Sequence, residues 1–589
     1  MGASGVQPGG AALPSLVRGE CSTPAEHVAA ASGVFPVSEL LVAALSDVER
    51  AGLPRCVRAP LEVVASRASA LDLFRSWADK LEGNRQEWAD SMPAGSPARA
   101  LHMSLIAFLA RGINHDDTDL VKDLTRGMDI TGEIPKTNVF RERTRVPTSS
   151  VEDWEARIPS TNARVIDQVM AKQGSEDSIA CWNLSLAEAE RGWLTKPVPV
   201  TPEVLNSLPL TPRFALPECH GQATQKKIRL IGDFKIFGVN GLLSSQDTCA
   251  PQGLDACLSA ISFMKLIDPA VVLRAFTEDF AHAYKTVGIP VAQSKFATIA
   301  LAPPTGPPHV ATLRTQPFGS ARAPANWGRV TKFIQHVLKK LFGVTVFVYV
   351  DDVFAVEPMI TCGSAHEVFT AACELLGFEL STGKSQPPSA AIYLLGAELA
   401  FDTFEFTARL PTRRRDDLMN DIRKILAYDQ LNPAQAAKLR GRLGFSQSLL
   451  FGKVGRALLQ PLTNRQYSRA PGRSHPLSED LAEALRWWLS ALECAKPRTI
   501  PYKIVKPALV YTDACGAGHV SAIVLVDGVK HVSRTHLPTW FIRSGAGIFE
   551  FELAAVLLGV CLVAAVTGDR PALVCCDNMR WSPTRVRGG

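Results

Sequence analysis

One short segment constrains the fold of this chain more than any other: Phe347-Val348-Tyr349-Val350-Asp351-Asp352-Val353-Phe354. Two adjacent aspartates interrupt an apolar run, which predicts a strand, a tight turn and a second strand. Carboxylates that project together from a turn repel each other, and a bound divalent cation relieves that repulsion. A plain surface turn is the competing interpretation. Asp-Asp also occurs at 116–117 and 416–417, where apolar strands do not flank the pair on both sides.

A second strand-like run, Ala275-Phe276-Thr277-Glu278-Asp279, also ends on carboxylates. Two-metal phosphoryl transfer needs carboxylates from separate strands to hold ions about 3.5–4 Å apart. One ion activates an attacking 3′-hydroxyl, and the other holds the triphosphate and the leaving pyrophosphate. Asp279 and Asp351 can form this bridge if their strands are neighbours, with Asp352 in support. We therefore expect two Mg²⁺ (or Mn²⁺) ions at these three aspartates.

A series of blocks in order along the chain resembles the motifs of retroelement reverse transcriptases. The blocks are 227–235, 279–284, 316–324, 349–352, 376–384 and 393–396. The resemblance implies an α/β (α+β) fold of the right-hand polymerase type. Fingers and palm would span residues 201–405, and a basic helical thumb or connection would span 406–500.

The resemblance also implies roles for residues around the incoming nucleotide. Lys227 and Arg229 would hold its triphosphate, because a forked guanidinium suits phosphate oxygens. Surface charge on a hairpin is the alternative for this pair. Phe318 and Gly319 would lie against the nucleotide and the template.

Two further roles follow from the same resemblance. Tyr284 would be a steric gate whose ring takes the space that a ribose 2′-hydroxyl needs; a core aromatic is the alternative. Lys384 would protonate the pyrophosphate, with a solvated loop lysine as the alternative. Asn240 lies further from Asp233 than is usual in the family, and Ser320 replaces a larger residue, so the branch stays open.

Positive charge is concentrated in the expected thumb. Residues 409–473 contain fourteen Lys or Arg and four Asp, a net charge of +10, while the whole chain carries only +6. Such a surplus suits a sequence-independent grip on a phosphate backbone. A solvated helical face is the alternative.

The C-terminal region, 505–589, begins a new α/β unit with strands at 508–512, 520–526 and 573–576 and a helix at 549–566. Asp527-Gly528 predicts a hairpin turn after the second strand. Asp513, Glu552 and Asp577 occupy a strand end, a helix and a second strand end, which is similar to the carboxylate set of ribonuclease H. The resemblance implies metal binding by these three residues, since that set also works with two metals. Three unrelated carboxylates are the alternative. The Asp577-Asn578 pair resembles tyrosine-recombinase-type retroelements. Because the family's last carboxylate lies further downstream, we expect an incomplete module whose ribonuclease H activity is lost.

The remaining features point to an intracellular protein of the cytoplasm or nucleus. Thirteen cysteines show no metal-ligand spacing, and no secretory signal is apparent. The apolar run 553–566 is too short for a membrane span, so we expect a buried helix and no membrane partner. Residues 1–200 are expected to be helical, with a disordered start, and show no chemical motif.

The interpretation is a retrotransposon RNA-directed DNA polymerase that acts on an RNA or DNA primer–template and deoxynucleoside triphosphates. Two alternatives stay open. One is an inactive retroelement remnant that binds nucleic acid, and the other is an RNA-dependent RNA polymerase.

Overall fold

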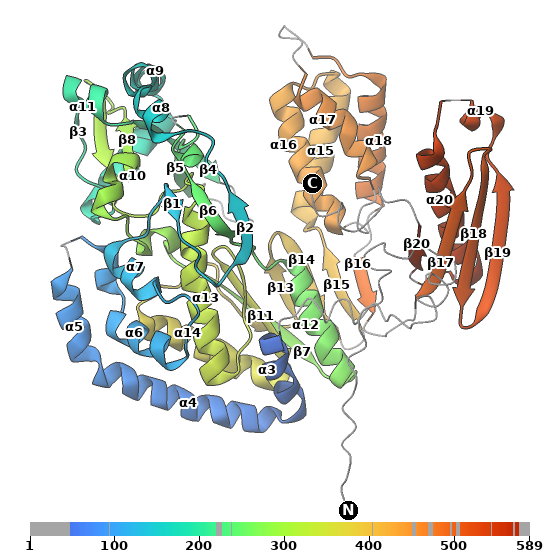
Figure 1. Cartoon of the computed structure of the whole chain (residues 1–589), viewed down its shortest axis with the longest axis horizontal. Coiled ribbons are helices and arrows are strands. Elements are labelled where there is room, and N and C mark those ends of the chain that lie inside the picture. The colour runs from blue at the N-terminus through green and yellow to red at the C-terminus, as the bar shows by residue number, and fades with distance from the viewer. Residues whose placement is uncertain are drawn as a thin grey trace, which may run out of the picture. The chain divides into compact units, whose positions relative to one another are not determined.

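The computed structural model describes residues 47–576 apart from 93–94, 219–226, 237, 403–404, 450–454, 469–474, 495–497, 502–506, 544, 569 and 571. The described residues fall into two compact units that divide between residues 500 and 501. Helices and several separate sheets alternate along the chain (Figure 1), which confirms the predicted α/β (α+β) class.

A four-stranded sheet in the first unit carries the predicted carboxylates. Its strands, in spatial order, are β10 (Phe347–Tyr349), β11 (Asp352–Pro358), β7 (Leu273–Asp279) and β12 (Gln386–Ser389). Each neighbouring pair is antiparallel. The predicted strand, turn and strand over 347–354 are therefore present. Helices α13 (Ala323–Phe342) and α14 (Met359–Leu376) share one hydrophobic core with this sheet.

Helices from the N-terminal region pack on this sheet and its core. Helix α3 (Asp47–Arg58) contacts β11. The core contains residues of α4 (Pro60–Lys80), α6 (Met103–Gly112) and α7 (Leu120–Arg126), and Trp88 of α5 (Glu82–Ser91) packs against it. Phe74 and Leu105 are buried in one cluster with Phe333 of α13. The guanidinium of Arg67 on α4 lies 2.7 and 2.8 Å from the two carboxylate oxygens of Glu357 on β11. No role was assigned to this region from the sequence. Its helices pack against the sheet that carries the carboxylates and form an ion pair with it.

Two more sheets and their helices lie between residues 133 and 312. One has the order β3 (Val198–Pro199), β9 (His309–Thr312), β8 (Thr298–Leu301), β4 (Thr211–Glu218) and β5 (Lys227–Gly232). The other has the order β1 (Glu133–Ile134), β6 (Ser244–Thr248) and β2 (Arg141–Arg145). The helices are α8 (Val151–Glu155), α9 (Ile158–Met170), α10 (Glu176–Glu190), α11 (Pro202–Ser207) and α12 (Leu254–Ile267).

The segment after the carboxylate sheet is a small sheet followed by helices. The sheet has the order β13 (Ala391–Leu394), β14 (Ala397–Phe401), β15 (Glu405–Arg409) and β16 (Arg498–Pro501). The helices are α15 (Thr412–Tyr428), α16 (Pro433–Leu449), α17 (Gln460–Gln466) and α18 (Glu479–Glu493). Leu418, Ile422, Leu443 and Trp488 bury one face of each contributing helix in a shared core. The charged residues are left on the outer faces.

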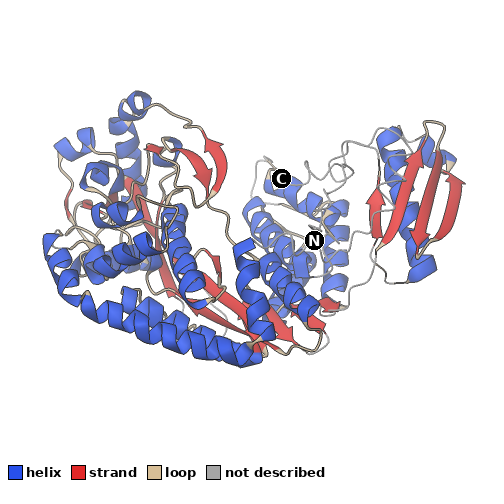
Figure 2. Cartoon of the chain, turned by 60° about the horizontal axis from the view of Figure 1, so that its bottom comes forward, coloured by secondary structure: helices blue, strands red, loops and turns tan. Residues whose placement is uncertain are grey.

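The second unit is a four-stranded sheet with a long helix packed on it. The order is β19 (Val529–His536), β18 (His519–Val526), β17 (Ala508–Ala514) and β20 (Ala572–Cys575), and β20 runs parallel to β17. Helix α20 (Ile548–Thr567) covers one face of the sheet, and α19 (Thr539–Ile542) precedes it (Figures 1 and 2). Asp527 and Gly528 both have positive φ, as the predicted two-residue hairpin requires.

The bounds of helix α20 agree with the predicted helix at 549–566 to within one residue at each end. The apolar run 553–566 was judged too short for a membrane span, but the whole helix has 20 residues with a mean hydropathy of 2.2. Among the described residues it is the one helix long and apolar enough to cross a membrane, judged by length and composition. The expectation of a buried helix was also wrong, since only 22% of that apolar window is buried. The core helix of a soluble protein passes the same test, and one face of α20 does pack on β17 and β18.

Candidate active site

The site is built around two aspartates on neighbouring strands. Asp279 ends β7, and Asp352 begins β11 directly opposite it in the antiparallel ladder. Asp351 lies one residue earlier, in the turn that follows β10. Val350 of this turn has a φ of 61°, a conformation that β-branched residues rarely adopt. The sheet register and this unusual turn together bring the three predicted carboxylates to one end of the sheet.

Two of the three carboxylates have raised pKa values. Burial, together with the charges of Asp351 and Asp279, raises the pKa of Asp352 to about 6. Burial, followed by the charge of Asp279, also raises the pKa of Asp351. Arg229 and Lys384 oppose this repulsion in part. The cluster therefore holds more negative charge than its own surroundings neutralise.

The oxygen atoms at the site fit a divalent cation. Oδ1 of Asp279 is buried and has no hydrogen-bond partner, which leaves a carboxylate oxygen available as a ligand. Its Oδ2 lies 2.9 Å from the ammonium of Lys384, so a cationic group already occupies that side. Mg²⁺ and Mn²⁺ prefer such oxygen donors. Among the described residues no group of three His, Cys, Asp or Glu side chains is placed so that it could hold a metal ion, so the carboxylates would have to converge on the ion.

A layer of three side chains lies beside the carboxylates. The guanidinium carbon of Arg229 is 4.6 Å from the ring centroid of Phe318, a cation–π geometry. The ring of Tyr284 lies on the same phenylalanine, with 4.9 Å between the ring centroids. Burial, together with the charge of Asp351, raises the pKa of the Tyr284 hydroxyl, which keeps it protonated. Three of the predicted nucleotide-binding residues thus contact one another.

Gly319 joins this layer to the fingers strand. It has a φ of 103°, and a Cβ at this position would lie 1.9 Å from the carbonyl oxygen of Gly232. The amide of Gly232 in turn donates to the carbonyl of Phe318 at 3.0 Å. Only glycine allows β5 and the 318–321 loop to approach so closely. Lys227, the other predicted triphosphate ligand, begins β5, and its side chain lies outside the described residues.

Asn240 has a role that its spacing in the sequence did not reveal. Its Nδ2 donates to the carbonyl of Gly319 at 3.0 Å, and its Oδ1 accepts from the amide of Ala321 at 2.8 Å. The Asn240 side chain therefore forms hydrogen bonds with two backbone groups of the 318–321 loop, which carries Phe318. The residue type could have indicated this role in the sequence, because a side-chain amide can donate and accept hydrogen bonds at once.

Glu278 is a second residue that the sequence analysis did not single out. It is 3% exposed, and its Oε1 lies 2.6 Å from both Nε2 of His366 and Oγ of Ser385. Adjacent strand residues point to opposite faces, so Glu278 faces away from Asp279. A second carboxylate directly before Asp279, in a run that the sequence predicts to be a buried strand, was the signal, because a buried carboxylate needs partners.

The second unit holds the other predicted carboxylates. Asp513 is exposed near the end of β17, and Glu552 lies on α20 with its Oε2 3.6 Å from the thiol of Cys576. Asp577 lies outside the described residues. The proposed ribonuclease-H-like set at Asp513, Glu552 and Asp577 therefore stays a prediction.

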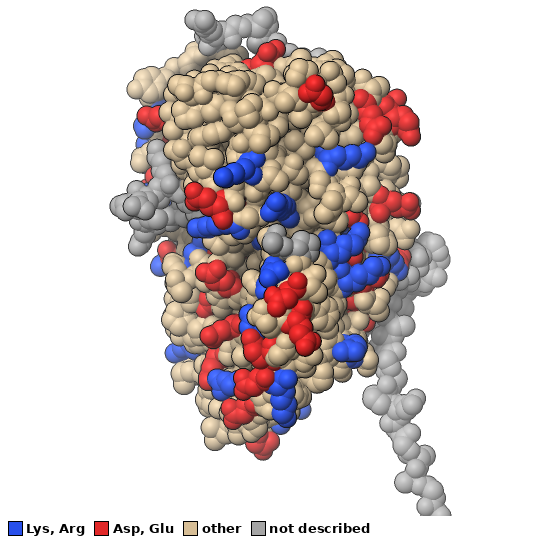
Figure 3. All heavy atoms as spheres, turned by 90° about the vertical axis from the view of Figure 1, so that its left-hand side faces the viewer, with Lys and Arg blue, Asp and Glu red and all other residues tan. Residues whose placement is uncertain are grey.

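The basic segment forms ion pairs as well as exposed charge. Arg423 pairs with Glu493 at 2.7 Å, and Arg442 pairs with Asp421. Lys424 and Lys438 are exposed on α15 and α16. Figure 3 draws another face, the left-hand side of Figure 1, where Lys and Arg are interspersed with Asp and Glu. The net positive charge of 409–473 thus persists on the helices, although neighbouring carboxylates reduce it.

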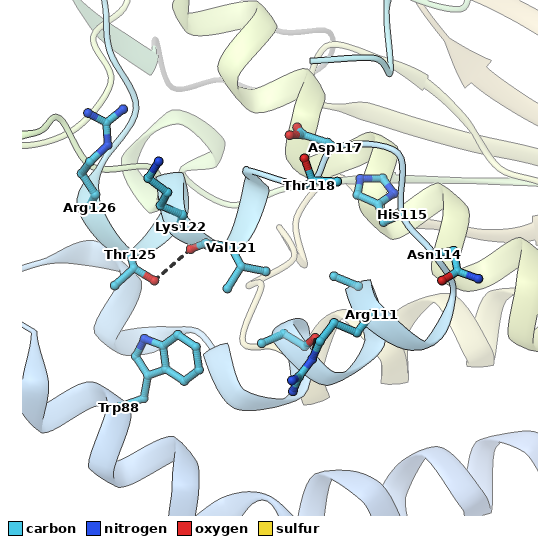
Figure 4. A pocket seen from close by; sticks show the side chains of 12 residues that line it. Trp88, Arg111, Asn114, His115, Asp117, Thr118, Val121, Lys122, Thr125 and Arg126 are labelled. Carbon is cyan, nitrogen blue, oxygen red and sulfur yellow. Dashed lines mark hydrogen bonds between the residues drawn. The ribbon is translucent and has the colours of Figure 1, made fainter. Parts of the chain in front are cut away.

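A pocket of about 960 Å³ lies elsewhere, among α5, α6 and α7 (Figure 4). Trp88, Arg111, His115, Lys122 and Arg126 are among its lining residues. None of the predicted site residues lines it. Arg126 and Lys122 already have aspartate partners, so the pocket offers little free positive charge. We therefore place the chemistry at the carboxylates.

Known proteins resemble this chain only distantly. No protein-family model matches the chain, and no curated protein matches it in sequence. A foamy viral protease–reverse transcriptase bound to double-stranded DNA is 14% identical with a TM-score of 0.40; the alignment covers 74% of this chain and 76% of that one. The foamy viral enzyme bound to an RNA/DNA hybrid is also 14% identical, with a TM-score of 0.42 and coverage of 76% and 61%. At these values the functional argument rests on the chain's own residues.

Proposed function

We propose that this chain is a nucleic-acid polymerase, an enzyme that extends a primer by nucleotidyl transfer. The observation that carries the proposal is the pairing of Asp279 with Asp352, with Asp351 in the adjacent turn. Carboxylates from two strands at one sheet end are what two-metal phosphoryl transfer requires. The layer of Arg229, Phe318 and Tyr284 beside them suits a nucleoside triphosphate, which presents phosphates and a flat base.

Within that class we propose an RNA-directed DNA polymerase of the retrotransposon type. Tyr284 supports this choice, because its ring is fixed against Phe318 and can exclude a 2′-hydroxyl. Its substrates would be deoxynucleoside triphosphates and an RNA or DNA primer–template, and it would act inside the cell. The two foamy viral neighbours are complexes with DNA or an RNA/DNA hybrid, as their descriptions state.

In this proposal the carboxylates bind the metal ions, and a basic residue binds the triphosphate. Asp279, Asp351 and Asp352 would hold two Mg²⁺ or Mn²⁺ ions, which when bound supply Lewis-acid activation of the 3′-hydroxyl and charge neutralisation on the leaving group. Arg229 would bind triphosphate oxygens while it rests on Phe318.

The surroundings of the carboxylates would orient the substrates. Gly319 and Asn240 hold the loop that positions Phe318. Lys384 lies beside the carboxylates, where it pairs with Asp279, and is our candidate proton donor to pyrophosphate. The basic helices α15 and α16 would grip the duplex by its backbone, with strong dependence on salt.

Primer extension on an RNA template with deoxynucleotides and Mg²⁺ tests the proposal. We expect extension by the full chain, and markedly less when ribonucleotides replace deoxynucleotides. Equal use of both nucleotides would indicate an RNA polymerase instead. Salt-sensitive duplex binding by a folded protein that does not extend would indicate an inactive remnant and overturn the proposal.

A further inference from the structure

The loop after α14 is held by backbone hydrogen bonds to β7 and to the residues directly after it. The amide of Ala281 donates to the carbonyl of Glu379 at 2.8 Å, and the amide of Ser381 donates to the carbonyl of Asp279 at 2.7 Å. At the other end of the loop, Gln386 is paired with Thr277 in the sheet. Residues 382–385 therefore span a short distance between two fixed points on the strand that carries Asp279.

Two side chains of that span contact the strand on its two faces. Ser385 donates to Oε1 of Glu278 at 2.6 Å, on the face covered by α14. Lys384 donates to Oδ2 of Asp279 at 2.9 Å, on the carboxylate face. His366 of α14 holds the same Oε1 of Glu278 at 2.6 Å, and its ring also lies on Phe276, 4.9 Å between centroids. Glu278 is thus a buried anchor that fixes Ser385, and Ser385 fixes its neighbour Lys384.

We propose that Lys384 is an exchangeable counter-cation of Asp279, held in place by Glu278 through Ser385, and that it competes with a divalent cation for the same carboxylate. The inference rests on the proposed function and adds a control of metal affinity to that site. The ammonium sits 2.9 Å from Oδ2, so its positive charge repels a cation that enters the same carboxylate, even at the free Oδ1. This repulsion is relieved when the ammonium turns away.

This geometry gives Glu278 and Ser385 a positioning role. The Lys384 side chain is 36% exposed, so it can swing into solvent on its flexible stem. Because the loop is anchored, the Lys384 ammonium favours the position paired with Asp279 over a position in solvent. Loosening the anchor should therefore favour the metal even though no charge at the site changes.

Calorimetric titration of Mn²⁺ into the full chain, without nucleic acid, tests the proposal. Lys384→Met removes the competitor and should lower the Kd for Mn²⁺ by roughly two- to fivefold, the size expected for losing a part-exposed ion pair. Ser385→Ala leaves every charge in place and should lower the Kd in the same direction by a smaller factor. In the double variant Ser385→Ala should add nothing, because its effect passes through Lys384.

Controls separate this inference from the proposed function. Lys235→Met removes an exposed lysine on the fingers turn and should leave the Kd unchanged. A Kd unchanged or raised in Lys384→Met, or a Ser385→Ala effect that persists in the Lys384→Met background, would overturn the inference alone. Mn²⁺ binding that Asp279→Asn does not weaken would overturn the metal site and this inference together. Thermal unfolding of each variant shows whether it is folded.

Discussion

Asp279 and Asp352 lie directly opposite each other on two antiparallel strands, although they are separated by more than seventy positions in the sequence. The register of one sheet therefore decides whether the site exists. Both strands are buried along most of their length, and a slip by one residue would turn each carboxylate to the other face. The apolar residues of β7 and β11 thus set the position of the polar ones.

Replacing Tyr284 should change nucleotide choice. Tyr284→Ala removes the ring that packs on Phe318, which opens space for a 2′-hydroxyl. We expect ribonucleotide use relative to deoxynucleotide use to rise by about ten- to a hundredfold in kcat/KM. Tyr428→Ala, at a tyrosine that is 77% exposed on α15, is the control and should leave the ratio unchanged. An unchanged ratio in Tyr284→Ala would rule out the gate.

A side chain at Gly319 should destabilise the first unit. Gly319→Ala places a Cβ 1.9 Å from a backbone oxygen at a φ of 103°, so either the loop or β5 must shift. We expect a loss of at least about 1–2 kcal/mol in the free energy of unfolding, measured with denaturant. Gly363→Ala is the control, because Gly363 is exposed within α14 and its Cβ meets nothing within 4 Å. That change should stabilise the protein by about 0.5–1 kcal/mol.

Breaking the Arg67–Glu357 pair should loosen the brace behind the carboxylate sheet. Both side chains are essentially inaccessible to solvent, so Arg67→Met leaves Glu357 as a buried, unpaired charge. We expect a loss of roughly 3–5 kcal/mol in the free energy of unfolding. The double variant Arg67→Met, Glu357→Met should recover much of this loss. A double variant no more stable than the single one would contradict this account of the pair.

Acid should destabilise the protein in part through His115. Burial, followed by the neighbouring His336, lowers the pKa of His115 to about 4 from the ordinary 6.5. Between these values the unfolded chain binds the proton more readily than the folded one, so stability is complete above pH 6.5 and falls as the pH drops towards 4. His115→Gln should flatten the pH dependence of unfolding in this window. An identical slope in both proteins would exclude this contribution.

The sequence predicted the local elements of the site well, because they depend on short patterns. The apolar runs around Asp351 and Asp352, the strand before Asp279 and the Asp527-Gly528 hairpin all lie where alternation and turn residues placed them. Contacts between distant segments could not be predicted in this way. Arg67 and Glu357 are 290 positions apart, and neither lies in a motif. Periodicity shows that a helix has a buried face but not what covers it.

Two further outcomes were beyond sequence reasoning for physical reasons. Lys384 was expected near pyrophosphate or in solvent, and its pairing with Asp279 depends on a loop anchored by Glu278 and Ser385. The exposure of α20 is the other outcome, because the helix lies where it was predicted but only 22% of its apolar window is buried. Composition indicated where apolar residues gather, but not whether another element covers them.

The most direct measurement of the central claim is single-turnover primer extension by a matched pair of charge variants. Asp351→Asn with Asp352→Asn neutralises the turn at the proposed metal site, while Asp416→Asn with Asp417→Asn neutralises an equal charge on α15. We expect the first variant to fall below about one hundredth of the wild-type rate at saturating Mg²⁺, since two-metal stabilisation supplies several kcal/mol. The second should retain most of the wild-type rate. Equal rates in the two variants, with both proteins folded, would contradict the assignment of Asp351 and Asp352 to catalysis.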